Sequence, residues 1–171
     1  MMNDIKDLIS ALTRPVTVSG HESSAENVIE EIRSLYFDKL EYDNADNYRL
    51  IKLAKSENAK KILIDVHMDE VGMIVTGITS EGFLKFEKVG GINSKVIIGR
   101  SVRVGENAVN GVIGIKPVHL VDKDKEDAIP SADELYIDIG AADKAEAEAV
   151  VSLGDAVWFG GGFEEFGDGF I

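Results

Sequence analysis

Three side chains that could bind or tune a metal ion, His67, Asp69 and Glu70, follow one apolar stretch of the sequence. Imidazole nitrogens and carboxylate oxygens are common ligands of zinc and related divalent ions. The preceding run 61–66 is rich in β-branched and aliphatic residues, which predicts a buried strand. In open α/β sheets, ligands bind just beyond the carboxyl ends of strands, so the pattern predicts a site there. The alternative is that His67 is only a structural histidine at the end of that strand.

The composition limits the chemistry available to any such site. The chain has 171 residues, of which 44% are hydrophobic and 29% charged, as expected for one or two globular domains. It contains no cysteine, so disulfides and thiolate metal sites are excluded. Any metal ion must therefore be held by histidine and by oxygen ligands.

The charge pattern argues against two classes of partner. The formal net charge is -13, and lysine and arginine are not clustered, so neither nucleic acid nor an anionic membrane is an expected partner. No apolar run of about 18 residues is present, and the N-terminus lacks the cationic and apolar layout of a signal peptide. We therefore expect a cytoplasmic protein without a membrane span.

The N-terminal third predicts two helices. Ile5, Leu8, Ile9 and Leu12 recur at helical spacing before Pro15. Ser19 with Glu22, and Ser23 with Glu26, match the capping-box pattern ahead of an apolar stripe over 25–36. His21 lies within this segment and could be a metal ligand, but a role in capping and packing is favoured.

The remaining residues predict mostly short strands. The turn at 43–47 leads into an alternating strand over 48–53. Further strands are expected at 73–79, 83–89, 101–104, 109–115, 135–139 and 154–159, with one helix over 142–151. Many short strands at close spacing favour a small barrel or sandwich. The fold class is therefore α/β at the N-terminus followed by an all-β part.

Five motifs occur in one order along nearly the whole chain. They are Ser19-Gly-His-Glu22, His67-Met-Asp69-Glu70-Val-Gly72, Val89-Gly90-Gly91, Gly111 to Leu120 with Lys116-Pro117-Val-His119, and Ile137-Asp-Ile-Gly140-Ala141. In this order and spacing they resemble the metal-dependent aminopeptidases that include glutamyl aminopeptidase, deblocking aminopeptidase and the tetrahedral (TET) peptidases, some of which are labelled cellulase M.

The resemblance implies a domain organisation. Residues 1–70 would be the N-terminal part of a phosphorylase/hydrolase-like α/β catalytic domain. Residues 71–159 would be an inserted β-barrel domain of PDZ-like character, which in the family makes subunit contacts. Residues 160–171 would lead back into the catalytic domain. A homo-oligomer is therefore expected.

The resemblance also implies a reaction and two site residues. In this family two metal ions, zinc or cobalt, activate a water that attacks the peptide bond next to a free N-terminus. The position of His67 is a metal ligand, and Asp69 matches the acid that orients this imidazole. The other ligands and the general base come later in family chains, and Glu164-Glu165 is interpreted as a solvent-exposed pair rather than the catalytic glutamates. The chain is therefore expected to be an N-terminal fragment that does not hydrolyse peptides alone.

The sequence leaves two other functions open. The β domain could serve as a non-catalytic binding or oligomerisation module, because unpaired strand edges pair readily with partners. A cellulase has little support, because sugar-binding grooves are usually lined with aromatic residues and Trp158 is the only tryptophan. His119 could lie near a neighbouring active site, although a role as a loop anchor is favoured.

Overall fold

The computed structural model describes residues 5–45, 47–115, 132–160 and 162–167. The chain divides into two compact units, one formed by Met1–Asp69 with Gly162–Ile171 and the other by Glu70–Gly161. The predicted turn residue Asp46 and the predicted loop carrying Lys116, Pro117 and His119 lie outside the described residues. Among the helices that are described, none is long and apolar enough to cross a membrane.

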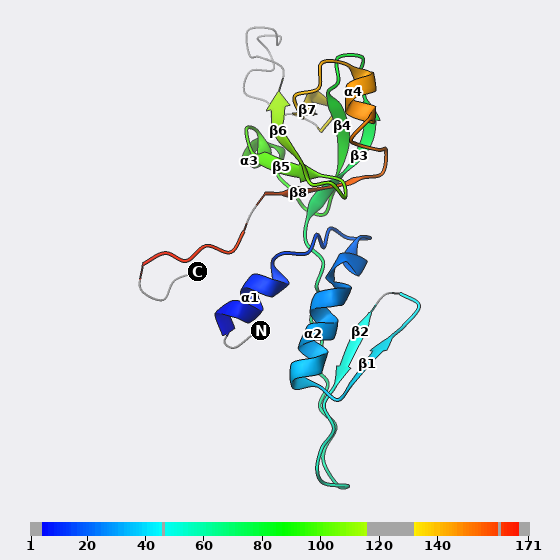
Figure 1. Ribbon diagram of the computed structural model, residues 1–171, viewed down its shortest axis with the longest axis vertical. Helices are drawn as coiled ribbons and strands as arrows, with labels where there is room; N and C mark the ends of the chain where they lie inside the picture. The colour runs from blue at the N-terminus through cyan, green and yellow to red at the C-terminus, as the bar shows by residue number, and fades with distance from the viewer. Residues whose placement is uncertain (1–4, 46, 116–131, 161, 168–171) are drawn as a thin grey trace. The chain divides into compact units, whose positions relative to one another are not determined.

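The first unit contains two α-helices and one β-hairpin (Figure 1). Helix α1 spans Ile5–Leu12, which confirms the prediction from apolar spacing. The short 3-10 helix η1 (Glu22–Ala25) precedes α2 (Glu26–Tyr36), whose Ile29 and Ile32 are buried. Strand β1 (Lys39–Tyr42) pairs antiparallel with β2 (Tyr48–Ile51). This unit therefore has helices and a two-stranded sheet but no larger sheet among its described residues.

The hairpin is closed by Asp38, which stands just before β1. Its carboxylate accepts a hydrogen bond from the Leu53 amide at 2.7 Å and lies 3.6 Å from Lys52 Nζ. The backbone hydrogen bond from Leu53 lowers the pKa of Asp38, with a smaller contribution from Lys52. The ionised carboxylate thus ties the end of β2 to the start of β1.

The predicted capping boxes are not formed. Neither η1 nor α2 has a side-chain hydrogen bond at its N-cap. The Ser24 hydroxyl donates to the Val16 carbonyl, and the Ser19 hydroxyl donates to Asp69 instead. The 3-10 turn ahead of α2 explains the difference, because its Ser23 carbonyl accepts from the Glu26 N–H at the start of α2.

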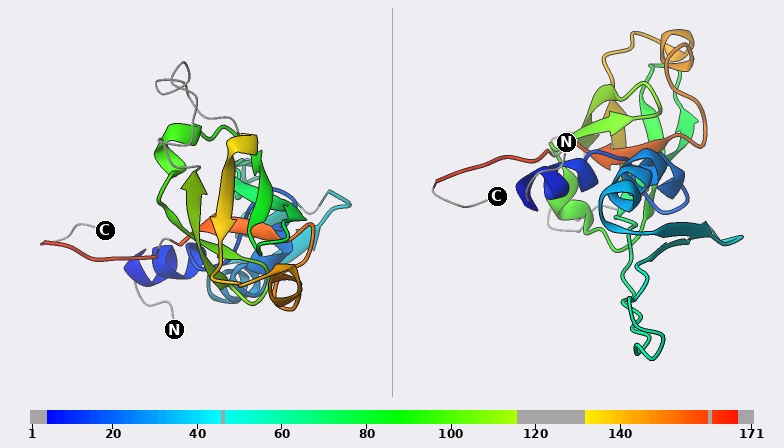
Figure 2. Two further views of the ribbon diagram at one scale, coloured as in Figure 1. Left: turned by 90° about the horizontal axis from the view of Figure 1, so that it is seen from above. Right: turned by 60° about the horizontal axis from the view of Figure 1, so that its bottom comes forward.

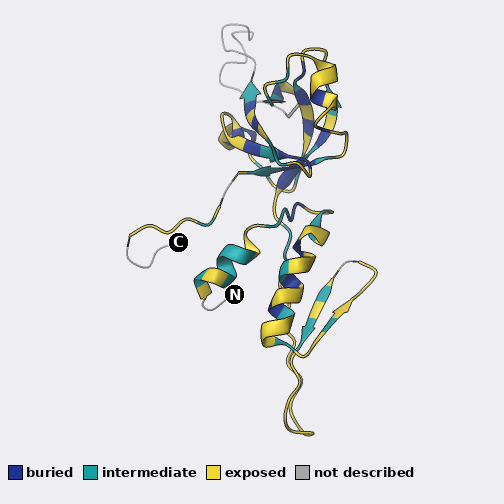
Figure 3. Cartoon of the chain, viewed as in Figure 1, coloured by how far each residue is buried: buried dark blue, intermediate teal, exposed yellow. Residues whose placement is uncertain are grey.

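The predicted buried strand at 61–66 is also wrong. These residues form no strand, and Ile62, Leu63 and Ile64 are 85%, 85% and 82% exposed. Figure 3 shows this segment as an exposed extended loop. A buried strand needs hydrogen-bonding neighbours, but β1 and β2 of this unit pair only with each other. The run therefore leaves a stretch of aliphatic side chains in contact with solvent.

The second unit is a closed six-stranded antiparallel barrel (Figures 1 and 2). The strands pair in the order β3-β4-β7-β6-β5-β8. Their bounds are Gly72–Ile78 for β3, Leu84–Val89 for β4, Ser101–Val104 for β5, Val109–Ile115 for β6, Leu135–Asp138 for β7 and Ala156–Phe159 for β8. The prediction of a small barrel is thus confirmed.

The interior of the barrel is filled by aliphatic side chains. Strand β4 alternates buried and exposed residues, as expected for a strand with one face in a core. Met73, Leu84, Val104, Ile137 and Val157 are fully buried. Figure 3 shows the buried positions as dark blue segments along the strands of the barrel. The barrel therefore has a complete core of its own.

Short helices connect the barrel strands. Helix α3 (Ser94–Ile97) was not predicted, and it begins at Asn93, whose side chain accepts from the Lys95 amide at 3.0 Å. The 3-10 helix η4 spans Ala132–Glu134. The helix predicted over 142–151 is shorter, α4 (Lys144–Glu148), with Asp143 as its N-cap.

A glycine in β6 allows the barrel to close tightly. A Cβ on Gly111 would lie 2.7 Å from Ile137 Cγ2, and Ile137 is fully buried. We expect Gly111→Ala to lower the free energy of unfolding by about 1–3 kcal/mol because the core cannot accept the added methyl without rearrangement. Urea denaturation would measure the change.

Gly91→Ala is the matched control for this substitution. A Cβ on Gly91 would meet nothing within 4 Å, and Gly91 has no positive φ. The control should unfold at a urea concentration close to the midpoint of the wild type. Equal effects of the two substitutions would contradict the packing argument.

Candidate functional site

The side chain of His67 is oriented by Asp69, two residues along the chain. Nδ1 of His67 lies 3.1 Å from the Asp69 main-chain oxygen and 3.2 Å from Asp69 Oδ1. The carbonyl oxygen, like the ionised carboxylate, can only accept a hydrogen bond, so Nδ1 carries the proton. The lone pair of the neutral ring is therefore on Nε2. Because the side chain is 87% exposed, this nitrogen is open to a ligand.

The second carboxylate oxygen of Asp69 has its own partner. The Ser19 hydroxyl donates to Asp69 Oδ2 at 2.7 Å, across 50 residues of sequence. This hydrogen bond is the main reason that the pKa of Asp69 is lowered, with a smaller contribution from His67. Asp69 is therefore ionised at neutral pH and available as an acceptor for His67.

Two other residues considered from the sequence have different surroundings. Glu70 begins the barrel unit. His21 is half-buried at the N-cap position of η1, and its Nδ1 atom is enclosed without a hydrogen-bond partner. His21 makes no side-chain hydrogen bond at that cap, so the capping part of its predicted role is wrong, whereas its half-buried side chain agrees with a role in packing.

Glu165 contacts a residue of the first helix. Its Oε2 atom lies 2.5 Å from Lys6 Nζ, and the carboxylate side chain is 53% exposed. Exposed ion pairs of this kind contribute little to stability. The contact agrees with the interpretation of Glu164-Glu165 as a surface pair.

Ser19 is the site residue that sequence reasoning missed. Its spacing to Glu22 suggested a helix cap, and nothing local in the sequence connects it with Asp69. Only the folded chain brings the two side chains together. A contact between residues this far apart has no periodic signal in a single sequence.

The described residues do not form a complete metal centre. No group of three or more His, Cys, Asp or Glu side chains that could hold an ion occurs among them. A catalytic zinc ion usually takes three protein ligands and a water. His67 fits as one of these, because its Nε2 is free and its Nδ1 is held by a carboxylate, as in many zinc sites.

The described residues thus form an α/β unit that carries the His67 and Asp69 pair and a second unit that is a closed β-barrel. The sequence profile of the M42 glutamyl aminopeptidase family matches residues 49–171. The chain therefore belongs to the M42 family.

Individual relatives agree with this assignment. The chain is 37% identical over 159 residues to a protein of Acetivibrio thermocellus, an alignment that covers 92% of this chain and 45% of that protein. It is 30% identical over 152 residues to the lysyl aminopeptidase of Pyrococcus furiosus, covering 83% of this chain and 41% of the relative. The chain thus spans about half the length of the curated relatives that it matches.

Solved structures give the same result. The TET aminopeptidase of a marine sediment Thaumarchaeota archaeon is 34% identical with a TM-score of 0.81, covering 90% of this chain and 43% of that one. The TET1 peptidase of Pyrococcus horikoshii can assemble into a tetrahedron or a large octahedral shell. It is 36% identical to this chain with a TM-score of 0.72, and the match covers 90% of this chain and 46% of that one. A similar structure from Thermotoga maritima, with 32% identity, a TM-score of 0.73 and coverage of 89% and 44%, carries the name endoglucanase.

The geometry predicts weak, site-specific binding of zinc. Zn²⁺ added to the chain should shift and broaden the imidazole resonances of His67 in NMR spectra, because the side chain is exposed and Nε2 is the nitrogen that Asp69 leaves open. With one ligand the affinity should be far below that of structural zinc sites, which bind with about 10–16 kcal/mol. His67→Ala should abolish the effect at this position.

Glu165→Gln is the control for the metal titration. It removes a carboxylate that lies in an ion pair with Lys6, so Zn²⁺ binding at His67 should be unchanged. Tight binding of Zn²⁺ that survives His67→Ala would contradict the assignment.

Proposed function

We propose that this chain forms the N-terminal part of a metal-dependent aminopeptidase that removes N-terminal residues from peptides. The observation that carries the proposal is the His67 and Asp69 pair, with Nδ1 bonded to the acid and Nε2 exposed, in a chain of the M42 family. The intact enzyme would hold two zinc or cobalt ions, which supply a water activated for attack on the peptide carbonyl.

The roles of the two residues follow from their contacts. His67 would be one ligand through Nε2, because Nδ1 donates to Asp69. Asp69 would fix the tautomer and the orientation of the ring, and its negative charge would make Nε2 a stronger electron donor. Asp69 is thus a positioning residue rather than the base that takes a proton from water.

We further propose that the chain alone does not hydrolyse peptides. Among the described residues no three His, Cys, Asp or Glu side chains are grouped to hold an ion, whereas a two-ion site needs several ligands, including a bridging carboxylate. The exposed aliphatic run at 61–66 supports the same proposal, because a catalytic sheet would give it the neighbouring strands that it lacks here. The region of the relatives that this chain does not span would supply both the strands and the remaining ligands.

The barrel is proposed to be an inserted domain of PDZ-like character, with residues 71–159 as its extent and 160–171 leading back to the catalytic domain. Its complete core supports an independent domain. Subunit contacts through this domain would make the protein a homo-oligomer, which the assembly of the similar TET1 peptidase supports.

The activity itself gives the direct test of the proposed function. The purified chain should show no measurable hydrolysis of amino acid p-nitroanilides in zinc or cobalt buffer. Addition of a polypeptide that corresponds to the unspanned half of the relatives should produce activity. In that mixture, Asp69→Ala should reduce activity by about 10–100-fold, as for other carboxylates that orient a metal-bound histidine, and His67→Ala should abolish it.

Lys6→Ala, which breaks the ion pair with Glu165, is the control in the same mixture and should retain activity. Robust turnover by the chain alone would overturn the proposed inactivity. Turnover in the mixture that survives His67→Ala would overturn the proposed role of His67.

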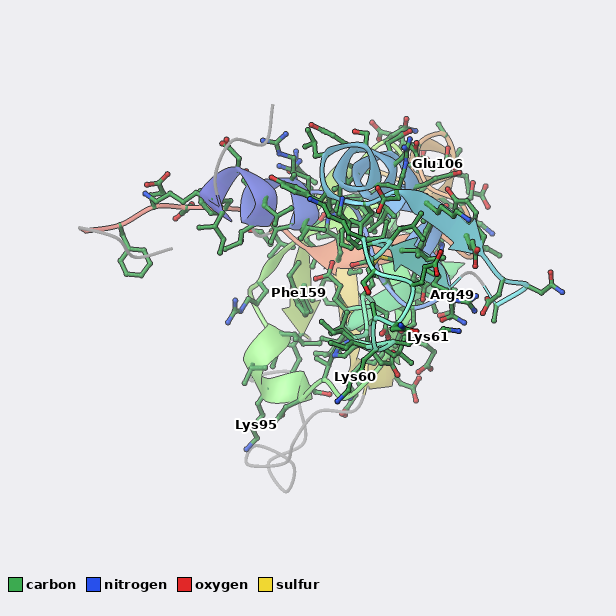
Figure 4. All side chains as sticks on the ribbon, turned by 90° about the horizontal axis from the view of Figure 1, so that it is seen from below. Arg49, Lys60, Lys61, Lys95, Glu106 and Phe159 are labelled. Carbon is green, nitrogen blue, oxygen red and sulfur yellow. The ribbon has the colours of Figure 1, made fainter. Side chains whose placement is uncertain are left out.

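A second candidate, a binding or oligomerisation module, is favoured by the apolar surface of both units. The barrel carries a groove of about 400 Å³ lined by Val71, Ile92, Val96, Ile97, Arg100 and Phe159. In Figure 4, Phe159 belongs to β8, and Lys95 extends from α3 into solvent. Val96 is 58% exposed, but the run at 62–64 is more exposed still. We therefore expect copies of the chain to associate through the run at 61–66 rather than through the barrel groove.

Light scattering can locate the surface used for association. The chain should be a dimer or larger, and Leu63→Asp with Ile64→Asp should dissociate it, because charges at the run oppose burial of an apolar strand. Val96→Asp in the barrel groove is the matched control and should leave the oligomer intact. A stable wild-type monomer would contradict the expectation, and dissociation by Val96→Asp alone would favour the barrel module.

A further inference from the structure

Three side chains of the first unit form a continuous hydrogen-bonded chain. The Ser19 hydroxyl donates to Asp69 Oδ2 at 2.7 Å, and His67 Nδ1 lies 3.2 Å from Asp69 Oδ1. The two carboxylate oxygens thus have different partners, one on each side. Asp69 thus stands between Ser19 on one side and the exposed ring of His67 on the other.

We propose that Ser19 is a positioning residue that fixes the carboxylate of Asp69 and, through it, the tautomer and orientation of the His67 ring. This inference rests on the proposed function in so far as His67 is a metal ligand. Ser19 does not touch a metal or a substrate in this account. It acts only on the second oxygen of Asp69.

The exposure of the site gives such a support a role, in addition to the Asp69 main-chain oxygen that lies 3.1 Å from His67 Nδ1. The side chain of His67 is 87% exposed and that of Asp69 is 43% exposed, so packing does little to hold either of them. An exposed carboxylate can rotate between several positions, and only some of them bring Oδ1 towards Nδ1. A hydroxyl bound to Oδ2 restricts this rotation, and a hydrogen bond to an ionised acceptor is roughly twice as strong as one between neutral groups.

The backbone around Ser19 is suited to this task. The His21 amide donates to the Val18 carbonyl at 2.8 Å, which closes a tight turn around Ser19 and Gly20. Gly20 has a φ of +92°, a conformation that favours glycine, and its amide donates to Glu22 Oε2 at 2.9 Å. Ser19 is therefore held by a defined turn, whereas Asp69 follows the unpaired run at 61–66.

Helix capping does not explain Ser19. The N-cap position of η1 is His21, and no side-chain hydrogen bond is made there. A serine hydroxyl has one proton to donate, and that of Ser19 is used on Asp69. The nearby Ser24 uses its proton on the Val16 carbonyl, so it stabilises the same segment without contacting the site.

The test compares Ser19→Ala with Ser24→Ala in the full chain without metal. The ¹⁵N shifts of the His67 ring nitrogens report the tautomer, and they should be well separated in the wild type, with the proton on Nδ1. In Ser19→Ala the two shifts should move towards each other as Asp69 loosens. Ser24→Ala should leave them unchanged, and Ser19→Thr, which keeps the hydroxyl, should restore the wild-type pattern.

A background variant isolates the route through Asp69. In Asp69→Ala, the further change Ser19→Ala should have no effect on His67, because the connecting carboxylate is gone. Titration with Zn²⁺ alone should give about tenfold weaker binding at His67 in Ser19→Ala than in the wild type, at the low end of the range for residues that support a ligand.

The outcomes separate this inference from the proposed function. Identical ¹⁵N shifts in the wild type and Ser19→Ala would overturn the positioning role of Ser19, even if Zn²⁺ binds normally at His67. Failure of Zn²⁺ to reach His67 in the wild type would overturn the ligand role instead, and the metal-free ¹⁵N measurement would still decide the role of Ser19. An equal effect of Ser24→Ala would also overturn the inference, because it would indicate a general loosening of the segment.

Discussion

The need of every strand for hydrogen-bonded neighbours determines how this chain is organised. In the barrel each strand has a neighbour on both sides, and the ring closes around a hydrophobic core. The run at 61–66 has the composition of a buried strand but no neighbours among the described residues, so it stays extended and exposed. The same requirement thus accounts for the closed barrel and for the exposed run.

The candidate site depends on that unpaired run. His67 and Asp69 follow it directly, so the backbone that carries them is not fixed by a sheet. The side-chain hydrogen bonds from Ser19 to Asp69 and between Asp69 and His67 are the contacts that order the site. A site ordered in this way can present one well-defined imidazole nitrogen. The described residues form no group of three or more possible ligands, and this is why we propose that the chain contributes to a metal centre rather than forming the whole of it.

Local patterns in the sequence predicted much of the fold. The apolar spacing of α1 and the strands of the barrel were recognisable because their signals lie within a few residues. The strand at 61–66 was predicted wrongly, because composition indicates burial whereas pairing depends on distant segments. His67 and Asp69 were found from their spacing, and the structure places them in contact. Ser19 was assigned to a helix cap, because a hydrogen bond across 50 residues leaves no local pattern.

The central claim is that His67 is a ligand of a metal centre to which this chain contributes only part. A crystal structure of the chain combined with the unspanned half of the relatives, with zinc located by anomalous scattering, tests it most directly. The account predicts an ion on His67 Nε2 whose other ligands come from the added polypeptide, with the run at 61–66 paired on both sides. Two ions fully ligated by residues of this chain alone would contradict it.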